Sequence, residues 1–135
     1  MKLVLIDGQG GRLGGLLTEA IKAAGLPCEI YAIGTNSIAT AAMLKAGADY
    51  GATGENPVVV ACRDADVIVG PIGIVAADSL LGEVTPTMAL AVGQSTAAKL
   101  LVPVNRCRMS VIGVAPLSMT DLVKETVAQL KALCR

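Results

Sequence analysis

The fold is decided by one stretch near the start of the chain, Leu3-Val4-Leu5-Ile6-Asp7-Gly8-Gln9-Gly10-Gly11-Arg12-Leu13-Gly14. Its first four residues are apolar and are followed by a glycine-rich turn, which predicts a short strand buried on both faces. Residues 12–24 then place apolar side chains at helical spacing, and Gly25 and Pro27 end that helix. A strand, a glycine turn and a helix in this order are typical of the unit that binds nucleotide phosphates.

The same alternation of strand and helix continues along the chain. We expect further strands at residues 30–33, 48–51, 66–69 and 99–104, and helices at residues 37–46, 55–65, 75–81, 86–92 and 117–133. This order predicts an α/β fold of the Rossmann-like, doubly wound type, with a mostly parallel sheet covered by helices on both faces. Residues 105–108 are compatible with a hairpin turn, which would add an antiparallel strand over residues 109–114. No linker is visible, so residues 1–135 are expected to form a single domain.

The composition excludes several classes of protein. The chain of 135 residues is 53% hydrophobic and carries 11 basic and 11 acidic side chains, so it lacks the basic surplus of a nucleic-acid-binding protein. It contains no histidine, which rules out histidine bases and histidine metal ligands, and we predict no metal site. Its longest uncharged apolar stretch, residues 67–77, is too short for a membrane span of about 20 residues. Its four cysteines form no CxxC pair, so we expect reduced thiols and a cytoplasmic location.

The glycine turn is the main candidate for a ligand site. Gly8, Gly11 and Gly14 form a GxxGxxG pattern, in which glycine permits a tight turn, a close approach of backbone to phosphate and helix-on-strand packing. The candidate cofactor-binding residues here are Gly8, Gln9, Gly10, Gly11, Arg12 and Gly14. Dinucleotide binding, binding of a smaller phosphate ligand and a purely structural turn remain open. Asp7 would repel a pyrophosphate unless a metal ion or a backbone N–H intervenes.

Other polar or glycine-rich segments follow the strands and therefore belong to the same edge of the sheet. Thr35 and Asn36 end the second strand, and Gly70 and Gly73 follow the fourth; these four are also candidate ligand residues. The only nearby acid, Glu29, lies at the start of the second strand instead of its end, which slightly favours NADP over NAD as the cofactor. Catalytic residues stay unknown.

Four further polar residues have less specific assignments. Glu55 and Asn56 are expected either to cap a helix or to orient a ligand. Asp78 and Glu83 flank a broken helical stretch, and we expect both to be solvated.

Two resemblances narrow the prediction. The turn Gly8-Gln9-Gly10-Gly11-Arg12-Leu13-Gly14 resembles the GxGGRMG-type nucleotide loop of dihydrodipicolinate reductases, which implies a dinucleotide loop. Almost the whole chain resembles a bacterial family of short proteins classed as a domain of unknown function. The matching segments include residues 6–11, 34–36, 43–48, 51–56, 70–74, 81–83 and 105–107. This resemblance implies a bacterial origin and a Rossmann-like fold.

Three functions are compatible with these features. The first is a binding module for a nucleotide or dinucleotide, without chemistry of its own. The second is a small NAD(P)-dependent oxidoreductase whose site is completed by dimerisation, with the turn Asn105-Arg106-Cys107 as a contributor. The third is a structural or partner-binding protein with no ligand. The apolar composition also predicts a homo-oligomer, because such chains bury exposed patches at symmetric interfaces.

Overall fold

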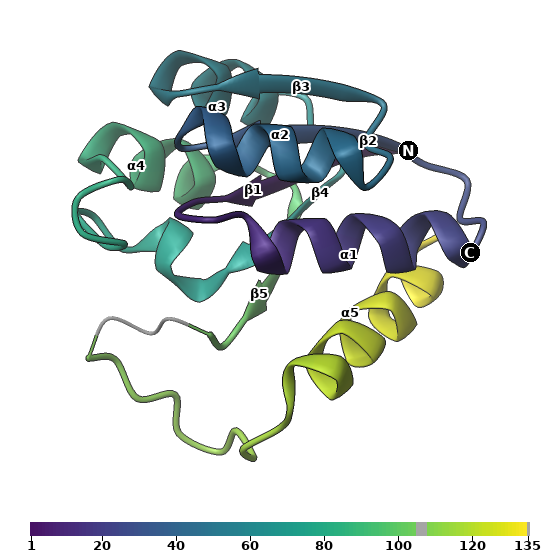
Figure 1. Cartoon of the computed structure of the whole chain (residues 1–135). Helices are drawn as coiled ribbons and strands as arrows, with labels where there is room; N and C mark the ends of the chain where they lie inside the picture. The colour runs from purple at the N-terminus through teal and green to yellow at the C-terminus, as the bar shows by residue number, and fades with distance from the viewer. Residues whose placement is uncertain (105–107, 135) are drawn as a thin grey trace.

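The computed structural model describes residues 1–104 and 108–134. Five strands form one parallel sheet in the order β3-β2-β1-β4-β5 (Figure 1). The strands are β1 (Lys2–Asp7), β2 (Glu29–Gly34), β3 (Tyr50–Thr53), β4 (Val67–Pro71) and β5 (Ala98–Val102). The predicted α/β class and doubly wound parallel sheet are therefore confirmed.

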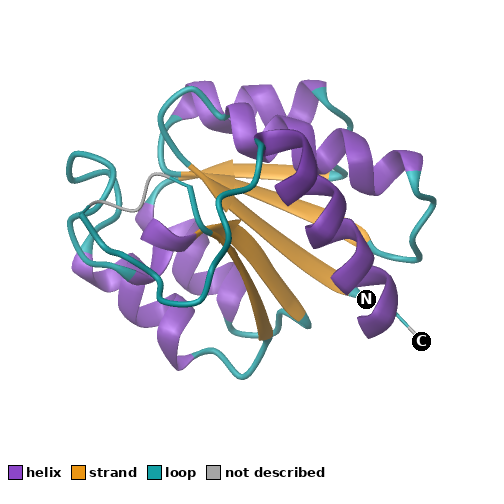
Figure 2. Ribbon diagram, turned by 90° about the horizontal axis from the view of Figure 1, so that it is seen from below, coloured by secondary structure: helices purple, strands orange, loops and turns teal. Residues whose placement is uncertain are grey.

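Helices cover both faces of this sheet (Figure 2). On one face lie α1 (Arg12–Ala23), α2 (Ser37–Lys45) and α5 (Met119–Leu133); on the other lie α3 (Glu55–Cys62), α4 (Pro86–Gln94) and the short 3-10 helix η1 (Ile72–Val75). The chain winds from β1 out to β3 and then returns to β4 on the other side of β1. Since parallel crossovers are right-handed, this reversal moves the connecting helices to the opposite face.

The core consists of two hydrophobic clusters, one on each face of the sheet. Leu3 and Leu5 of β1 point into the cluster under α1 and α5, whereas Val4 and Ile6 point into the cluster under α3 and α4. All four side chains are at most 2% exposed. The opening apolar run is thus buried on both sides, as predicted, because it is the central strand.

Residues 75–81 do not form the predicted helix. The backbone is left-handed at Asp78 (φ 66°), Leu80 (φ 55°), Leu81 (φ 57°) and Gly82 (φ 88°), and a right-handed helix has no place for such residues. The chain instead makes a series of turns that fold over the carboxyl ends of the strands. We call residues 76–85, between η1 and α4, the cover segment.

The predicted antiparallel strand over residues 109–114 is also wrong. In the part of the chain that the structure describes, residues 108–118 contain no strand. The left-handed conformations of Arg108 (φ 66°) and Gly113 (φ 86°) turn the backbone at both ends of this stretch. Pro103, directly after β5, has no N–H with which to continue a ladder.

The two ends of the described chain meet at the amino edge of the sheet. Met1, Leu133 and Cys134 line one hollow together with Val67 and Ala98, the first residues of β4 and β5. Figure 1 shows the marks N and C on the same side of the molecule. The glycine turn lies at the opposite, carboxyl edge, because all five strands run parallel.

Candidate site at the carboxyl edge of the sheet

The site is built where the connections after β1, β2 and β4 converge. Parallel strands place these three connections at one edge, and the winding reverses between β1 and β4. Ligands of open α/β sheets bind at such a reversal point. The residues brought together here are Asp7, Gln9, Thr35, Asn36 and Glu83.

The Asp7 side chain caps the N-terminal turn of α1. Its side chain is 5% exposed; Oδ1 accepts the Gly8 N–H at 2.8 Å, and Oδ2 accepts the Gly14 N–H at 2.7 Å. Gly11, at the N-cap position, has no side chain for this purpose, so Asp7 takes that role. Burial raises the pKa of Asp7, the two amide hydrogen bonds oppose that rise, and the charge of Glu83 adds to it.

The three glycines of the GxxGxxG pattern are required for packing. A Cβ on Gly8 would lie 2.5 Å from Thr35 Oγ1, one on Gly11 would lie 2.7 Å from Ala39 Cα, and one on Gly14 would lie 2.6 Å from Met43 Sδ. Gly10 differs, because a Cβ there would meet nothing within 4 Å. Of these four glycines, Gly10 is therefore the one that has open space where a side chain would begin.

The amide groups of the turn divide into paired and unpaired sets. Gly8 and Gly14 donate to Asp7, Gln9 donates to Glu83, and Gly11 donates to the Gly8 carbonyl at 3.0 Å. Within the described part of the chain, the N–H groups of Gly10, Arg12 and Leu13 have no acceptor. The side chain of Arg12, the first residue of α1, is exposed. Together they form the open donor set at the positive end of the α1 dipole.

Glu83 provides the least expected contact of the site. Its Oε1 accepts three hydrogen bonds: from Gln9 N–H at 2.9 Å, from Thr35 Oγ1 at 2.8 Å and from Asn36 Nδ2 at 2.7 Å. No described residue donates to its Oε2. Partial burial opposes ionisation, but the three hydrogen bonds outweigh it and lower the pKa of Glu83 below its usual value. The expectation that Glu83 is merely solvated is wrong, whereas Asp78 is exposed as expected.

The cover segment holds Glu83 in place through several anchors. The Ser79 hydroxyl donates to the Gly73 carbonyl, and the Asp78 N–H donates to the Val84 carbonyl at 2.7 Å. Leu80 and Val84 are 3% and 1% exposed in the core. At the end of the segment, Thr85 Oγ1 donates to Glu55 Oε1 at 2.6 Å. Glu55 thus tethers this segment, in addition to lying in the first turn of α3.

Thr35 and Asn36 join the turn, but each is already engaged within the fold. Asn36 accepts the Ala39 N–H at 2.9 Å as the N-cap of α2, and its Nδ2 also donates to the Gln9 carbonyl at 2.9 Å. Thr35 and Asn36 are half-buried, whereas Gln9 and Gly10 are exposed. Hydrogen bonds join Gln9, Thr35 and Asn36 to Glu83, and Gly10 follows Gln9 in the exposed turn.

Gly70 and Gly73 occupy buried positions behind the cover segment. A side chain at Gly70 would overlap the Ile6 carbonyl group of the neighbouring strand. The Gly73 carbonyl accepts hydrogen bonds from Ser79 and from the Ala76 N–H. The turn Asn105-Arg106-Cys107 lies outside the described residues.

Sequence reasoning missed Glu83 because its partners lie 47 to 74 positions away along the chain. The only local signal was its place two residues before Thr85, which caps α4 and precedes Pro86. That signal predicts a helix start and says nothing about a contact with β1 or β2.

Cys62 is a buried thiol at the end of α3. It is 3% exposed, and burial raises its pKa to about 11. Because the thiolate is the reactive form, we expect iodoacetamide at pH 7.5 to leave Cys62 unmodified in the folded protein and to label it in urea. Peptide mapping by mass spectrometry measures this, and labelling of the native protein at Cys62 would contradict the buried position.

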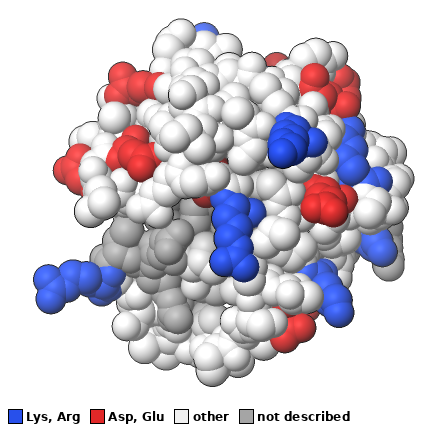
Figure 3. Space-filling model, in the orientation of Figure 1, with Lys and Arg blue, Asp and Glu red and all other residues white. Residues whose placement is uncertain are grey.

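Among residues 1–104 and 108–134, His, Cys, Asp and Glu form no group of three suited to a metal ion. In the same residues, no helix is long and apolar enough to cross a membrane. On the face of the molecule seen in Figure 3, basic and acidic side chains are interspersed among uncharged residues.

Comparison with known proteins places the chain in a family. No curated protein matches it. One similar solved structure is a dodecameric FMN-dependent UbiX-like decarboxylase from Escherichia coli O157:H7, with 16% sequence identity and a TM-score of 0.44; the match covers 98% of this chain and 94% of that one. A family model described as a domain of unknown function (DUF3842) matches residues 2–135. The chain therefore belongs to the DUF3842 family.

Proposed function

We propose that this protein is a nucleotide-binding module whose ligand lies across the carboxyl edge of β1 and β2. In this proposal a ribose binds at Glu83, and a phosphate group binds at the N–H groups of Gly10, Arg12 and Leu13. The observation that carries it is the Glu83 carboxylate, which is fixed through Oε1 by three donors and whose Oε2 accepts no hydrogen bond from the described residues.

The ribose position follows from where Glu83 lies. Rossmann-type domains hold the ribose hydroxyls with an acidic residue at the end of the second strand. Here β2 ends at Gly34, and the residues that follow it, Thr35 and Asn36, are not acidic. The carboxylate is that of Glu83, which comes from the connection before α4. A carboxylate oxygen with no protein donor is the acceptor that a sugar hydroxyl requires.

The phosphate position follows from the open donor set of α1. Three N–H groups to which no described residue offers an acceptor favour an anion at this helix start, and the exposed Arg12 of the same turn supplies a positive charge. The Asp7 carboxylate is buried and occupied by the amides of Gly8 and Gly14, so the phosphate would contact the outer N–H groups only.

The charges of the site reverse the preference between the two nicotinamide cofactors. The sequence favoured NADP because no acid was visible at the end of the second strand. A 2′-phosphate at this position would be repelled by the Glu83 carboxylate and by the charge of the buried Asp7 nearby, whereas a free 2′-hydroxyl would donate a hydrogen bond to Glu83. Our proposal is therefore a ligand with unmodified ribose hydroxyls, and NAD is the first compound to test.

Isothermal titration calorimetry with NAD and NADP tests this function. We expect NAD to bind and NADP to bind at least about 10-fold more weakly. Glu83→Gln keeps one oxygen for the three protein donors but presents an amide N–H₂ in place of Oε2. It should weaken NAD by about 10-fold or more, because hydrogen bonds to charged groups contribute about 1.5–3 kcal/mol.

Glu19→Gln is the control, because Glu19 is an exposed acid of α1 and takes no part in the contacts described above that hold the cover segment and the glycine turn. We expect this variant to bind NAD like the wild type. Absence of NAD binding, or equal binding by wild type and Glu83→Gln, would refute the proposal.

A further inference from the structure

The tip of the cover segment is a tight turn with Leu81 and Gly82 at its centre. The Glu83 N–H donates to the Leu80 carbonyl at 3.2 Å, which closes the turn. Leu81 (φ 57°) and Gly82 (φ 88°) both have positive φ, as in a type I′ turn. Glycine, asparagine and aspartate adopt this conformation readily, whereas a bulky residue with positive φ is an outlier. The backbone therefore gives no reason for a leucine at position 81.

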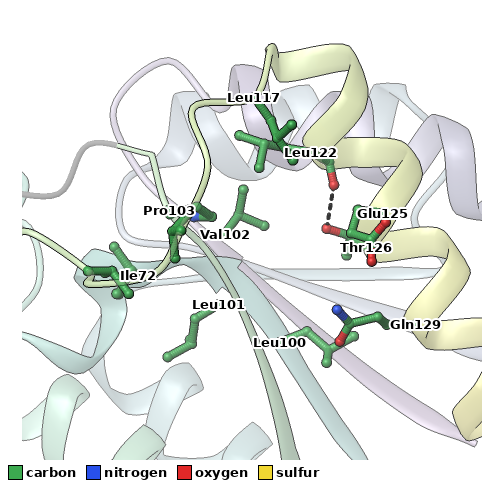
Figure 4. Close-up of a pocket in the computed structure, with 12 residues that line it drawn as sticks. Ile72, Leu100, Leu101, Val102, Pro103, Leu117, Leu122, Glu125, Thr126 and Gln129 are labelled. Atoms are coloured by element: carbon green, nitrogen blue, oxygen red, sulfur yellow. Dashed lines mark hydrogen bonds between the residues drawn. The ribbon is translucent and has the colours of Figure 1, made fainter.

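The packing of the chain gives no reason for this leucine either. The Leu81 side chain is 98% exposed, whereas that of Leu80 is 3% exposed. Other apolar side chains outside the core face one another: Leu101, Val114 and Leu122 line a hollow of about 230 Å³ beside β5 (Figure 4). At 98% exposure, Leu81 has almost no contact of this kind.

The residues on both sides of this tip approach the glycine turn. A Cβ on Gly8 would lie 3.0 Å from Leu80 Cδ1 and 3.0 Å from Glu83 Oε1. Glu83 Oε1 also accepts the Gln9 N–H at 2.9 Å. Consecutive Cα atoms are about 3.8 Å apart, so a tip of two residues stays close to the glycine turn that its neighbours contact. Leu81 is thus an exposed apolar side chain beside the proposed ribose position.

We propose that the Leu81 side chain contacts the planar base of a nucleotide whose ribose is held by Glu83. This inference rests on the proposed function and deepens it, because the ligand then carries an aromatic base and is not a sugar phosphate alone. Strained backbone of non-glycine residues clusters at ligand-contacting sites, where the surrounding structure maintains it. Here Leu80 and Glu83 maintain it, and Leu81 offers an apolar surface to the face of the base.

Leu81→Asn separates binding from folding. Asparagine is close to leucine in size, and Asn-Gly is a preferred sequence at the centre of a type I′ turn, so the midpoint of thermal unfolding should equal or exceed that of the wild type. In isothermal titration calorimetry, NAD should bind at least about 5-fold more weakly, because the apolar contact with the base is lost. Leu81→Met keeps an apolar side chain and should bind NAD within about 2-fold of the wild type.

Leu90→Asn is the matched control. Leu90 is a leucine of α4 that is 57% exposed, and it lines a hollow with Cys62 and Arg63 at the C-terminal end of α3, which leads back to the amino edge of the sheet. This variant should bind NAD like the wild type.

Methyl NMR of protein with ¹³C-labelled leucine observes the contact directly. The methyl signals that disappear in Leu81→Asn should shift when NAD is added to the wild type, because the ring current of the base acts on them. The signals that disappear in Leu90→Asn should stay in place.

The outcomes distinguish this inference from the function on which it rests. If the wild type binds NAD and Leu81→Asn binds it equally well, the contact at Leu81 is overturned while the nucleotide site stands. Leu81 methyl signals that do not move at saturating NAD would have the same meaning. Absence of NAD binding by the wild type would overturn both.

Discussion

Gly11→Ala is expected to lower the free energy of unfolding by about 2–5 kcal/mol. Gly11 has φ +72°, a conformation that costs an L-residue about 1–2 kcal/mol. Its new Cβ would also lie 2.7 Å from the Ala39 Cα, where backbone has to move; overpacking of this kind costs about 1–3 kcal/mol. The two costs add because one concerns the residue itself and the other its contact with α2.

Gly10→Ala is the control for this experiment. A Cβ at Gly10 would meet open space, so we expect its unfolding free energy to stay within about 0.5 kcal/mol of wild type. Urea denaturation of the three proteins gives the comparison. Equal stability of Gly11→Ala and wild type would mean that α1 and α2 do not approach each other as closely as described.

Asp7→Ala is expected to lower the free energy of unfolding by about 2–4 kcal/mol. The change leaves the amides of Gly8 and Gly14 without their acceptors in a buried place, and each such loss costs about 1–3 kcal/mol. Relief of the buried charge offsets part of this cost. A loss below about 0.5 kcal/mol in urea denaturation would contradict the capping role of Asp7.

The pH dependence of stability separates the charge of Asp7 from its hydrogen bonds. Because the pKa of Asp7 is raised above 3.8 in the folded state, the folded protein binds this proton more tightly than the unfolded chain. The stabilisation of the folded state by this proton is fully present below pH 3.8 and is lost as the pH rises through the raised pKa of Asp7. Asp7→Asn cannot titrate, so the stability of wild type relative to this variant should fall over that range. A constant difference would argue against the raised pKa.

The first βα unit was predictable because its signals are local. Four apolar residues, a glycine turn and a helix of period 3.6 specify β1 and α1 without reference to the rest of the chain. The buried position of β1 and the presence of helices on both faces follow from the same alternation. What each glycine does was not predictable, because Gly8, Gly11 and Gly14 are constrained by Thr35, Ala39 and Met43, which become neighbours only after folding.

The errors lie where long-range contacts override local preference. Residues 75–81 have helical composition, but burial of Leu80 and the anchoring of Glu83 at the glycine turn impose left-handed backbone on the segment between η1 and α4. From the sequence, Glu83 is predicted to be solvated. Its three hydrogen-bond donors lie in the connections that follow β1 and β2, far away along the chain. The stretch 109–114 has strand composition, yet no described residue offers it a ladder.

The meeting of Met1 and Cys134 in one hollow, away from the glycine turn, has a practical consequence. Affinity tags, fluorophores or surface tethers attached at either extremity would project from the end of the molecule remote from Glu83. A short loop joining the two extremities would also yield a circularly permuted protein, with new ends in a surface connection of choice and the glycine turn intact.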